Sequence, residues 1–248
     1  MLLVDMPLKP DDGRDWIGQL SSSGRPDYLA LMDQHPDRAL GMRVSDLPIV
    51  AQEDTMQAMR SWPDAFKGSA KPIGAEADVL KRITGVHRAI PSISFSDELK
   101  LHLGDREVLF WHRPGPTAGA MWVVLPDAEV AFIGDAVTVS EPPYIGDADT
   151  EAWIETLDEL RSDKLSSYIL ISGRDGRVDR AAVNAMARFV RKIPVRLKRM
   201  KKKGDSTQTA ESAAKGLLKD YRVPTVRHDL VLLRLQSGLS KLHSRGAS

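Results

Sequence analysis

The chain has 248 residues, of which 42% are hydrophobic and 28% are charged, a composition typical of a globular protein that can bury a sizeable core. Because cysteine is absent, disulfides, thiolate catalysis and cysteine-ligated zinc are excluded. No apolar run is long enough to cross a membrane, and Met1–Asp5 is too short for a signal peptide, so we expect a cytoplasmic protein with no membrane association.

The net charge of +1 hides a strong asymmetry along the chain. Residues 177–248 contain 18 Lys and Arg but 5 Asp and Glu, whereas residues 1–176 contain 17 Lys and Arg and 29 Asp and Glu. The two segments therefore carry net charges of +13 and −12. This division predicts an acidic body, residues 1–176, followed by a basic extension, residues 177–248.

The first third of the chain predicts strands that alternate with helices. Short apolar runs predict strands at 1–5, 27–32 and 47–51, and residues 10–20 and 53–62 predict helices. The polar turn DQHPD separates the second strand from a helix that begins near Arg38, and side chains in such a turn can converge on a ligand. Residues 63–92 are punctuated by Pro and Gly and are assigned to no element.

Two segments in the middle of the chain alternate polar and apolar residues around a turn, the signature of a β-hairpin. They are residues 93–112 and 121–134. A helix at 150–162 and a strand at 167–172 follow, and the chain after Asp179 is predicted to be mainly helical. Apolar residues at helical spacing mark the buried faces of the helices at 150–162 and near the C-terminus: Trp153, Leu157 and Leu160, then Leu232, Leu235, Leu239 and Leu242.

This order of elements resembles the metallo-β-lactamase superfamily. LLVDMP (2–7) resembles the family's strand with an Asp near its end, and DYLALMDQHPDRALG (27–41) resembles the segment with the HxHxDH motif. PGPTAG (114–119), IGDAV (133–137) and YILISGRDG (168–176) resemble the PGHTxG loop, the strand that ends in Gly-Asp, and the strand before the Pro-Gly-His-Gly turn. The resemblance covers residues 1 to about 176 and implies a four-layer αββα sandwich that is short at its N-terminus, with a helical basic C-terminal extension.

The resemblance also implies where metal ligands would stand. Hydrolases of the family hold two zinc ions whose bridging hydroxide attacks the substrate. The first ion's positions correspond to Asp33, His35 and Pro116, and the second ion's to Asp37, Arg38, Arg174 and the bridging Asp135. Proline has no side-chain donor atom, and arginine keeps its proton and offers no lone pair. We therefore predict that the two-zinc site is lost and expect no cofactor.

Two further roles for these residues are open. Asp33, Asp37 and Asp135 would face one another across a pocket, where Arg38 and Arg174 would neutralise them as bidentate ion pairs or would bind a small anion. Alternatively, Asp33, His35, Asp37 and Asp135 would hold one divalent cation (Mg, Mn or Zn), and their oxygen donors favour Mg or Mn. His112, four residues before Pro116, is a further candidate donor, although a histidine at a strand end is more often packed or solvated.

The predicted function is that of a degenerate, non-catalytic or small-anion-binding relative of the family. If the protein is an enzyme, it is a metal-dependent hydrolase with a rebuilt single-metal site. A third possibility is nucleic-acid binding through RLKRMKKK (196–203), but this run lacks the interleaved aromatic residues of single-strand binders. Docking of the extension on the acidic body, or self-association into a homo-oligomer, is favoured instead.

Overall fold

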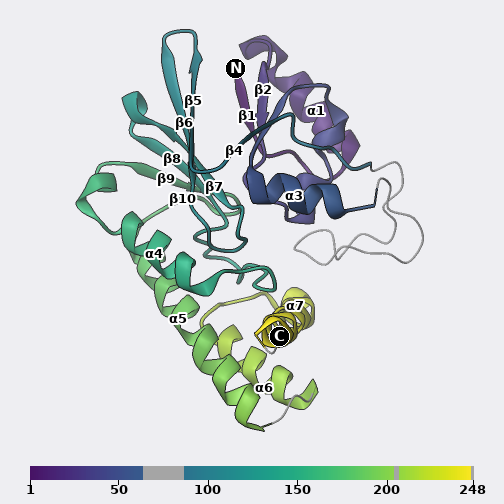
Figure 1. Ribbon diagram of the computed structural model, residues 1–248, viewed down its shortest axis with the longest axis vertical. Coiled ribbons are helices and arrows are strands. Elements are labelled where there is room, and N and C mark those ends of the chain that lie inside the picture. Colours follow the sequence, from purple (N-terminus) through teal and green to yellow (C-terminus); the bar gives the residue numbers. More distant parts are fainter. Residues whose placement is uncertain (64–86, 204–206, 247–248) are drawn as a thin grey trace. The chain divides into compact units, whose positions relative to one another are not determined.

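The computed structural model describes residues 1–63, 87–203 and 207–246, which form two compact units (Figure 1). Unit 1 comprises Met1–His112 and Gly119–Ala128, and unit 2 comprises Arg113–Ala118 and Glu129–Ser248. The predicted domains, residues 1–176 and 177–248, follow charge rather than compactness and stay a prediction. Most of the segment that the sequence left unassigned, 63–92, lies outside the described residues.

Unit 1 contains a four-stranded parallel sheet in the order β1-β2-β3-β4. Its core joins the strand residues Leu3 and Leu29, and Leu31 just after β2, to Met59, and Trp16 packs against this cluster. The strands are Leu2–Val4, Tyr28–Ala30, Ile49–Gln52 and Ile93–Phe95, and the helices are α1 (Pro10–Leu20), α2 (Pro36–Ala39) and α3 (Glu53–Ser61), with 3-10 turns at Ser21–Ser23 and Met42–Val44.

The second sheet has six strands in the order β10-β9-β8-β7-β6-β5. The first predicted hairpin is confirmed, because β5 pairs antiparallel with β6 and Gly104 takes a left-handed φ of 64° in the turn between them. Strands β8 and β9 pair in parallel. The strands are β5 (Glu98–Leu103), β6 (Arg106–His112), β7 (Met121–Leu125), β8 (Val130–Gly134), β9 (Ile169–Ser172) and β10 (Gly176–Val178).

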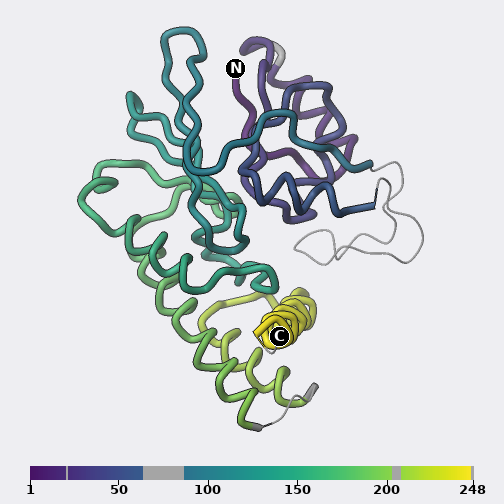
Figure 2. Tube along the Cα trace, viewed as in Figure 1, coloured from purple at the N-terminus to yellow at the C-terminus, as the bar shows by residue number. Residues whose placement is uncertain are grey.

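Four helices follow in unit 2, and the predicted helical extension is confirmed. Helix α4 buries Trp153, Leu157 and Leu160, the face that the sequence predicted. Figure 2 traces α5 alongside α4, and α6 packs against α7. In α7, Leu235 and Leu239 are buried. The helices are α4 (Thr150–Leu160), α5 (Arg180–Lys203), α6 (Thr207–Leu218) and α7 (Thr225–Arg245).

The chain therefore has two sheets flanked by helices, the αββα architecture that the resemblance implies. None of the helices in the described ranges combines the length and apolar character that a bilayer crossing needs. The predicted cytoplasmic location is a separate matter and stays a prediction.

Candidate functional site

Asp5 and Asp33 of unit 1 follow the carboxyl ends of the neighbouring strands β1 and β2. Strands β1 and β2 are parallel, with Val4 opposite Ala30, so the residues after both strands reach the same sheet edge. Asp5 follows β1 with a φ of 57°, a conformation that Asp tolerates better than most residues. Its Oδ1 accepts a hydrogen bond from the Met32 amide at 2.9 Å, which fixes the carboxylate beside the turn after β2.

The turn between β2 and α2 lies about two residues earlier in the chain than the sequence predicted. The strand ends at Ala30 rather than Met32, because the amide of Met32 bonds the Asp5 carboxylate instead of a neighbouring strand. Asp33 Oδ1 accepts from the amide of His35 at 2.8 Å, an Asx turn that reverses the chain. Helix α2 then begins at Pro36, with proline in its first turn, and not near Arg38.

This turn buries three side chains of the predicted site. Asp33, His35 and Arg38 are 1%, 2% and 4% exposed. Arg38 Nη1 lies 3.2 Å from Asp5 Oδ2, and Arg38 Nε lies 3.5 Å from Asp33 Oδ1. His35 Nδ1 lies 3.3 Å from the same Asp33 oxygen. One guanidinium therefore contacts two carboxylates in unit 1, and one of them belongs to Asp5, which was not among the predicted site residues.

Unit 2 has a second pair of the same kind. Strands β8 and β9 are parallel, and Gly134 lies opposite Ser172, so Asp135 and Arg174 follow the two strands at one edge of the sheet. Arg174 donates from Nε and Nη2 to Asp135 Oδ2, at 3.0 and 2.7 Å. Both of these bonds end on the same carboxylate oxygen. The Asp135 side chain is fully buried, and that of Arg174 is 19% exposed.

The loop that contains Pro116 is held against α4. The carbonyl of Pro114 accepts from Thr156 Oγ1 at 2.7 Å, and the carbonyl of Gly115 accepts from the amide of Asp149 at 3.0 Å. A Cβ on Gly115 would lie 2.8 Å from Trp153 Cδ1, so only glycine fits this close approach. Pro116 itself is buried.

The donor set does not fit the two-zinc centre that the resemblance implies. Pro116 offers no donor, and Arg38 and Arg174 bring fixed positive charges to Asp33 and Asp135, two positions that the resemblance assigns to metal ligands. Three buried residues do have side chains of metal-ligating types: Asp33 and His35 in unit 1, and Asp135 in unit 2.

Two further candidate residues, Asp37 and His112, both belong to unit 1. Asp37 is half-buried in α2, and His112 ends β6, also half-buried. The expected convergence of Asp33, Asp37 and Asp135 stays a prediction, because the first two belong to unit 1 and the third to unit 2.

Comparisons with known proteins agree with this fold. The family model described as "Metallo-beta-lactamase superfamily" matches residues 44–170, about half of the chain. The matched range begins after Arg38 and ends before Arg174, so it includes Pro116 and Asp135 but not the turn after β2. No curated protein sequence matches the chain.

Solved structures show the same likeness at low sequence identity. A metallo-beta-lactamase from Pontibacter korlensis aligns with a TM-score of 0.60 and 14% identity, over 77% of this chain and 81% of that one. TMB-1 aligns with a TM-score of 0.58 and 16% identity, over 77% and 80%. DIM-1 metallo-beta-lactamase, in a crystal exposed to ceftazidime, aligns with a TM-score of 0.58 and 18% identity over the same shares. Identities this low establish the fold alone.

Proposed function

Because the chain belongs to the metallo-β-lactamase superfamily, we propose that it is a non-hydrolytic member in which arginine–carboxylate ion pairs stand where the family holds zinc. On this proposal the former metal positions serve stability, and any ligand of the protein binds elsewhere. Arg38 and Arg174 then have a structural role rather than an anion-binding role, because each guanidinium already contacts a carboxylate of its own unit.

The pair between Arg174 and Asp135 carries this proposal. A buried carboxylate is costly unless a positive charge compensates it, and the guanidinium supplies that charge at 2.7 Å. A divalent cation bound to the same carboxylate would lie close to the guanidinium. At a separation of about 4 Å and an effective dielectric constant near 20, their repulsion is roughly 8 kcal/mol. Metal binding therefore requires Arg174 to leave.

One observation favours a second candidate function. Asp33, His35 and Asp135 are buried and have the donor types of a site for one divalent cation (Mg, Mn or Zn). A hydrolase with a rebuilt single-metal site would need such donors. We rank it second because Arg38 and Arg174 contact two of these three residues.

Metal analysis separates the two candidates. The protein, purified without chelators and passed through gel filtration, should contain far less than one equivalent of Zn, Mn or Mg. Phosphodiester, thioester and β-lactam substrates should be hydrolysed only at background rates with each metal added. One metal ion per chain that is lost in His35→Ala would support the single-metal hydrolase, and two zinc ions per chain would overturn our proposal.

A variant that restores the family's donors tests whether the seven positions are assigned correctly. Asp33→His, Arg38→His, Pro116→His and Arg174→His together should gain zinc that the native chain lacks. The matched control repeats these changes with Asp135→Asn, which removes the bridging ligand and should lower the zinc content. If the restored variant folds poorly, a calorimetric zinc titration of the native chain still tests the proposal, because a stoichiometric binding isotherm would contradict it.

We also propose that the main role of the basic extension is to dock on acidic residues of the body. Within unit 2, Arg227 Nη2 donates to Glu141 Oε2 at 2.9 Å, and Lys241 Nζ lies 2.7 Å from Asp147 Oδ1. Helix α7 therefore uses its cations against acidic residues of the segment before α4. Self-association into a homo-oligomer is a further proposal, and light scattering across protein concentrations tests it.

A further inference from the structure

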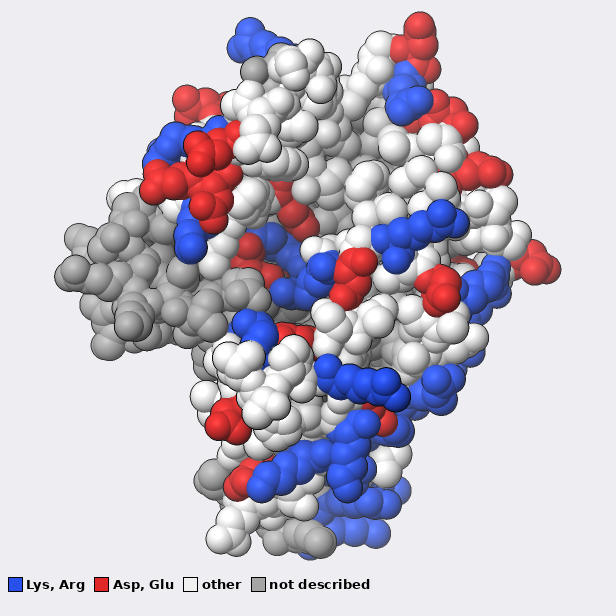
Figure 3. Space-filling view, turned by 180° about the vertical axis from the view of Figure 1, so that it is seen from behind, with Lys and Arg blue, Asp and Glu red and all other residues white. Residues whose placement is uncertain are grey.

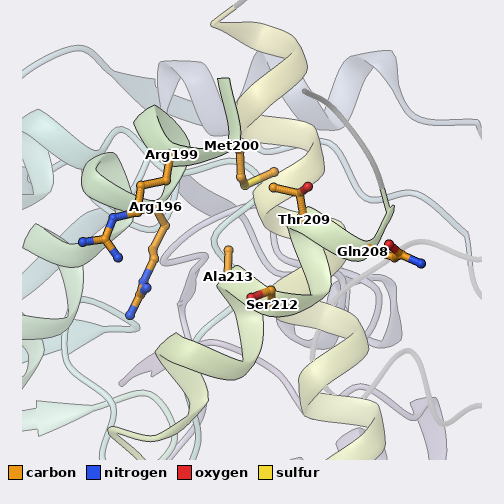
Figure 4. Close-up of a pocket in the computed structure, with 7 residues that line it drawn as sticks. All are labelled: Arg196, Arg199, Met200, Gln208, Thr209, Ser212 and Ala213. Carbon is orange, nitrogen blue, oxygen red and sulfur yellow. The ribbon is translucent and has the colours of Figure 1, made fainter. Parts of the chain in front are cut away.

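The corner between α5 and α6 contains a polar pocket that plays no part in the function proposed above. Its volume is about 250 Å³, and Figure 4 shows its lining side chains. The α6 residues contribute two hydroxyls and an amide, the α5 residues contribute two guanidinium groups, and no lining residue is acidic. The lining residues are Arg196, Arg199, Met200, Gln208, Thr209, Ser212 and Ala213.

Two cations near the pocket, Lys192 and Lys215, pair with carboxylates, whereas the pocket arginines do not within the described residues. Within the part of the chain that the structure describes, no carboxylate lies in ion-pair distance of Arg196 or Arg199. The described acidic residues in and just after α6 are already paired: Glu211 with Lys215, and Asp220 with Lys192 at 2.6 Å. Figure 3 shows Lys and Arg side chains gathered over the part of unit 2 that α5–α7 form. Among the described residues, therefore, no carboxylate offsets the two positive charges of the pocket.

The packing of α5 on α6 fixes the position of the Arg196 side chain. Its side chain is half-buried, and a Cβ added to Gly216 of α6 would lie 2.8 Å from Arg196 Nη2 and 2.9 Å from Cζ. The guanidinium therefore lies against the α6 backbone at the one residue that has no side chain. Glycine is unfavourable in the interior of a helix, so Gly216 lowers the helix propensity of α6. Its missing side chain leaves the space that the Arg196 guanidinium occupies. Gly216 lies one turn after Ser212, on the same face of α6.

The polarity of α6 adds to the positive potential. The helix begins at Thr207, its first turn has no acidic residue, and Gln208 and Thr209 of that turn line the pocket. The amide groups of a first helical turn carry partial positive charge and favour an anion. Two guanidinium groups, two hydroxyls and the first turn of α6 therefore line one pocket, and all of them are groups that can bind the oxygens of an anion.

We propose that this α5–α6 pocket binds a phosphoryl group. Phosphate presents oxygens in the geometry that arginine matches with paired N–H donors, and its size suits the pocket. The group comes either from a free phosphate compound or from a nucleic acid backbone. Exposed Lys198 and Lys202 extend the basic surface of α5 beyond the pocket, and residues four apart on a helix are spaced by about 6 Å, so a polymer would meet further cations there.

The test compares the full-length chain with Arg196→Gln/Arg199→Gln at low ionic strength. Inorganic pyrophosphate, titrated by calorimetry, and a fluorescent single-stranded oligonucleotide, titrated by anisotropy, are the probes. The matched control is Lys219→Gln/Arg222→Gln, which removes two exposed cations of the same region outside the pocket. We expect the pocket variant to bind the effective probe at least tenfold more weakly and the control to stay within about twofold, since each charged hydrogen bond contributes more than one decade in affinity.

Further measurements identify the source of the phosphoryl group and exclude a general effect of charge. If a nucleic acid supplies the phosphate, the oligonucleotide binds more tightly than pyrophosphate, and the slope of log affinity against log salt falls in magnitude by about 1.4 in the pocket variant. If a free compound supplies it, pyrophosphate binds and the oligonucleotide does not. Ser212→Ala, which keeps all charges, should also weaken binding. Absence of binding for both probes, or equal losses in the pocket variant and the control, would overturn the proposal, and the metal content bears on the proposed function alone.

Discussion

Removing the Arg174 guanidinium is the sharpest test of the idea that arginine has replaced metal in this fold. Arg174→Met keeps an apolar stem of similar length and leaves the fully buried Asp135 carboxylate without its partner. Breaking a buried ion pair typically costs about 3–5 kcal/mol. The Arg174 side chain is 19% exposed, so water can screen part of the loss, and we expect about 3 kcal/mol, the lower end of that range.

The assay is thermal unfolding by calorimetry together with urea titration. For a chain of this size, 1 kcal/mol shifts Tm by roughly 2–4 °C, so the transition that involves unit 2 should fall by about 6–12 °C. The matched control is Arg191→Met. Arg191 also pairs with an aspartate, Asp158, at 3.1 Å, but the two side chains are 43% and 47% exposed, and such a pair contributes about 0–1 kcal/mol.

A double variant distinguishes lost charge compensation from lost packing. Arg174→Met/Asp135→Asn removes both charges, so it should be clearly more stable than Arg174→Met alone, because no uncompensated carboxylate is buried. If Arg174→Met and Arg191→Met lower Tm equally and slightly, Asp135 does not need the guanidinium, and the argument that arginine substitutes for metal fails.

Three further predictions concern changes to residues of unit 2. Deleting residues 225–248 removes α7, which buries Leu235, and should expose apolar surface, so the soluble fraction should drop and dye binding should rise; a fully soluble, stable truncation would refute the docking of α7. Burial raises the pKa of the Tyr221 phenol, so its contribution to stability is complete below the unfolded pKa of about 10 and is lost as pH rises above that value. Urea titrations between about pH 9 and pH 11 should therefore show a smaller loss of stability in Tyr221→Phe than in the native chain. Gly115→Ala places a Cβ 2.8 Å from a Trp153 ring carbon and should cost about 1–3 kcal/mol in urea unfolding, whereas no cost would show that the loop can shift freely.

The sequence alone predicted the elements whose signals are local. The hairpin from β5 to β6 follows from alternating side chains and a glycine that can take a left-handed φ of 64°. The buried face of α4 follows from Trp153 and Leu157 at helical spacing. The sequence also predicts that zinc-binding capacity is lost, because the absence of a donor atom in proline and of a lone pair in arginine is a property of the residue and not of its surroundings.

The tertiary structure decided which charges meet. Asp5 and Arg38 are 33 positions apart, and Asp135 and Arg174 are 39 apart, so no local pattern pairs them. They meet because neighbouring parallel strands bring their carboxyl ends to one sheet edge, which also makes Asp5 a partner that the HxHxDH-like segment does not contain. The early end of β2 has the same origin, since the Asp5 carboxylate takes the Met32 amide. Likewise, Arg196 lies on Gly216 only because α5 and α6 pack together, and a basic run in the sequence becomes a pocket through that packing.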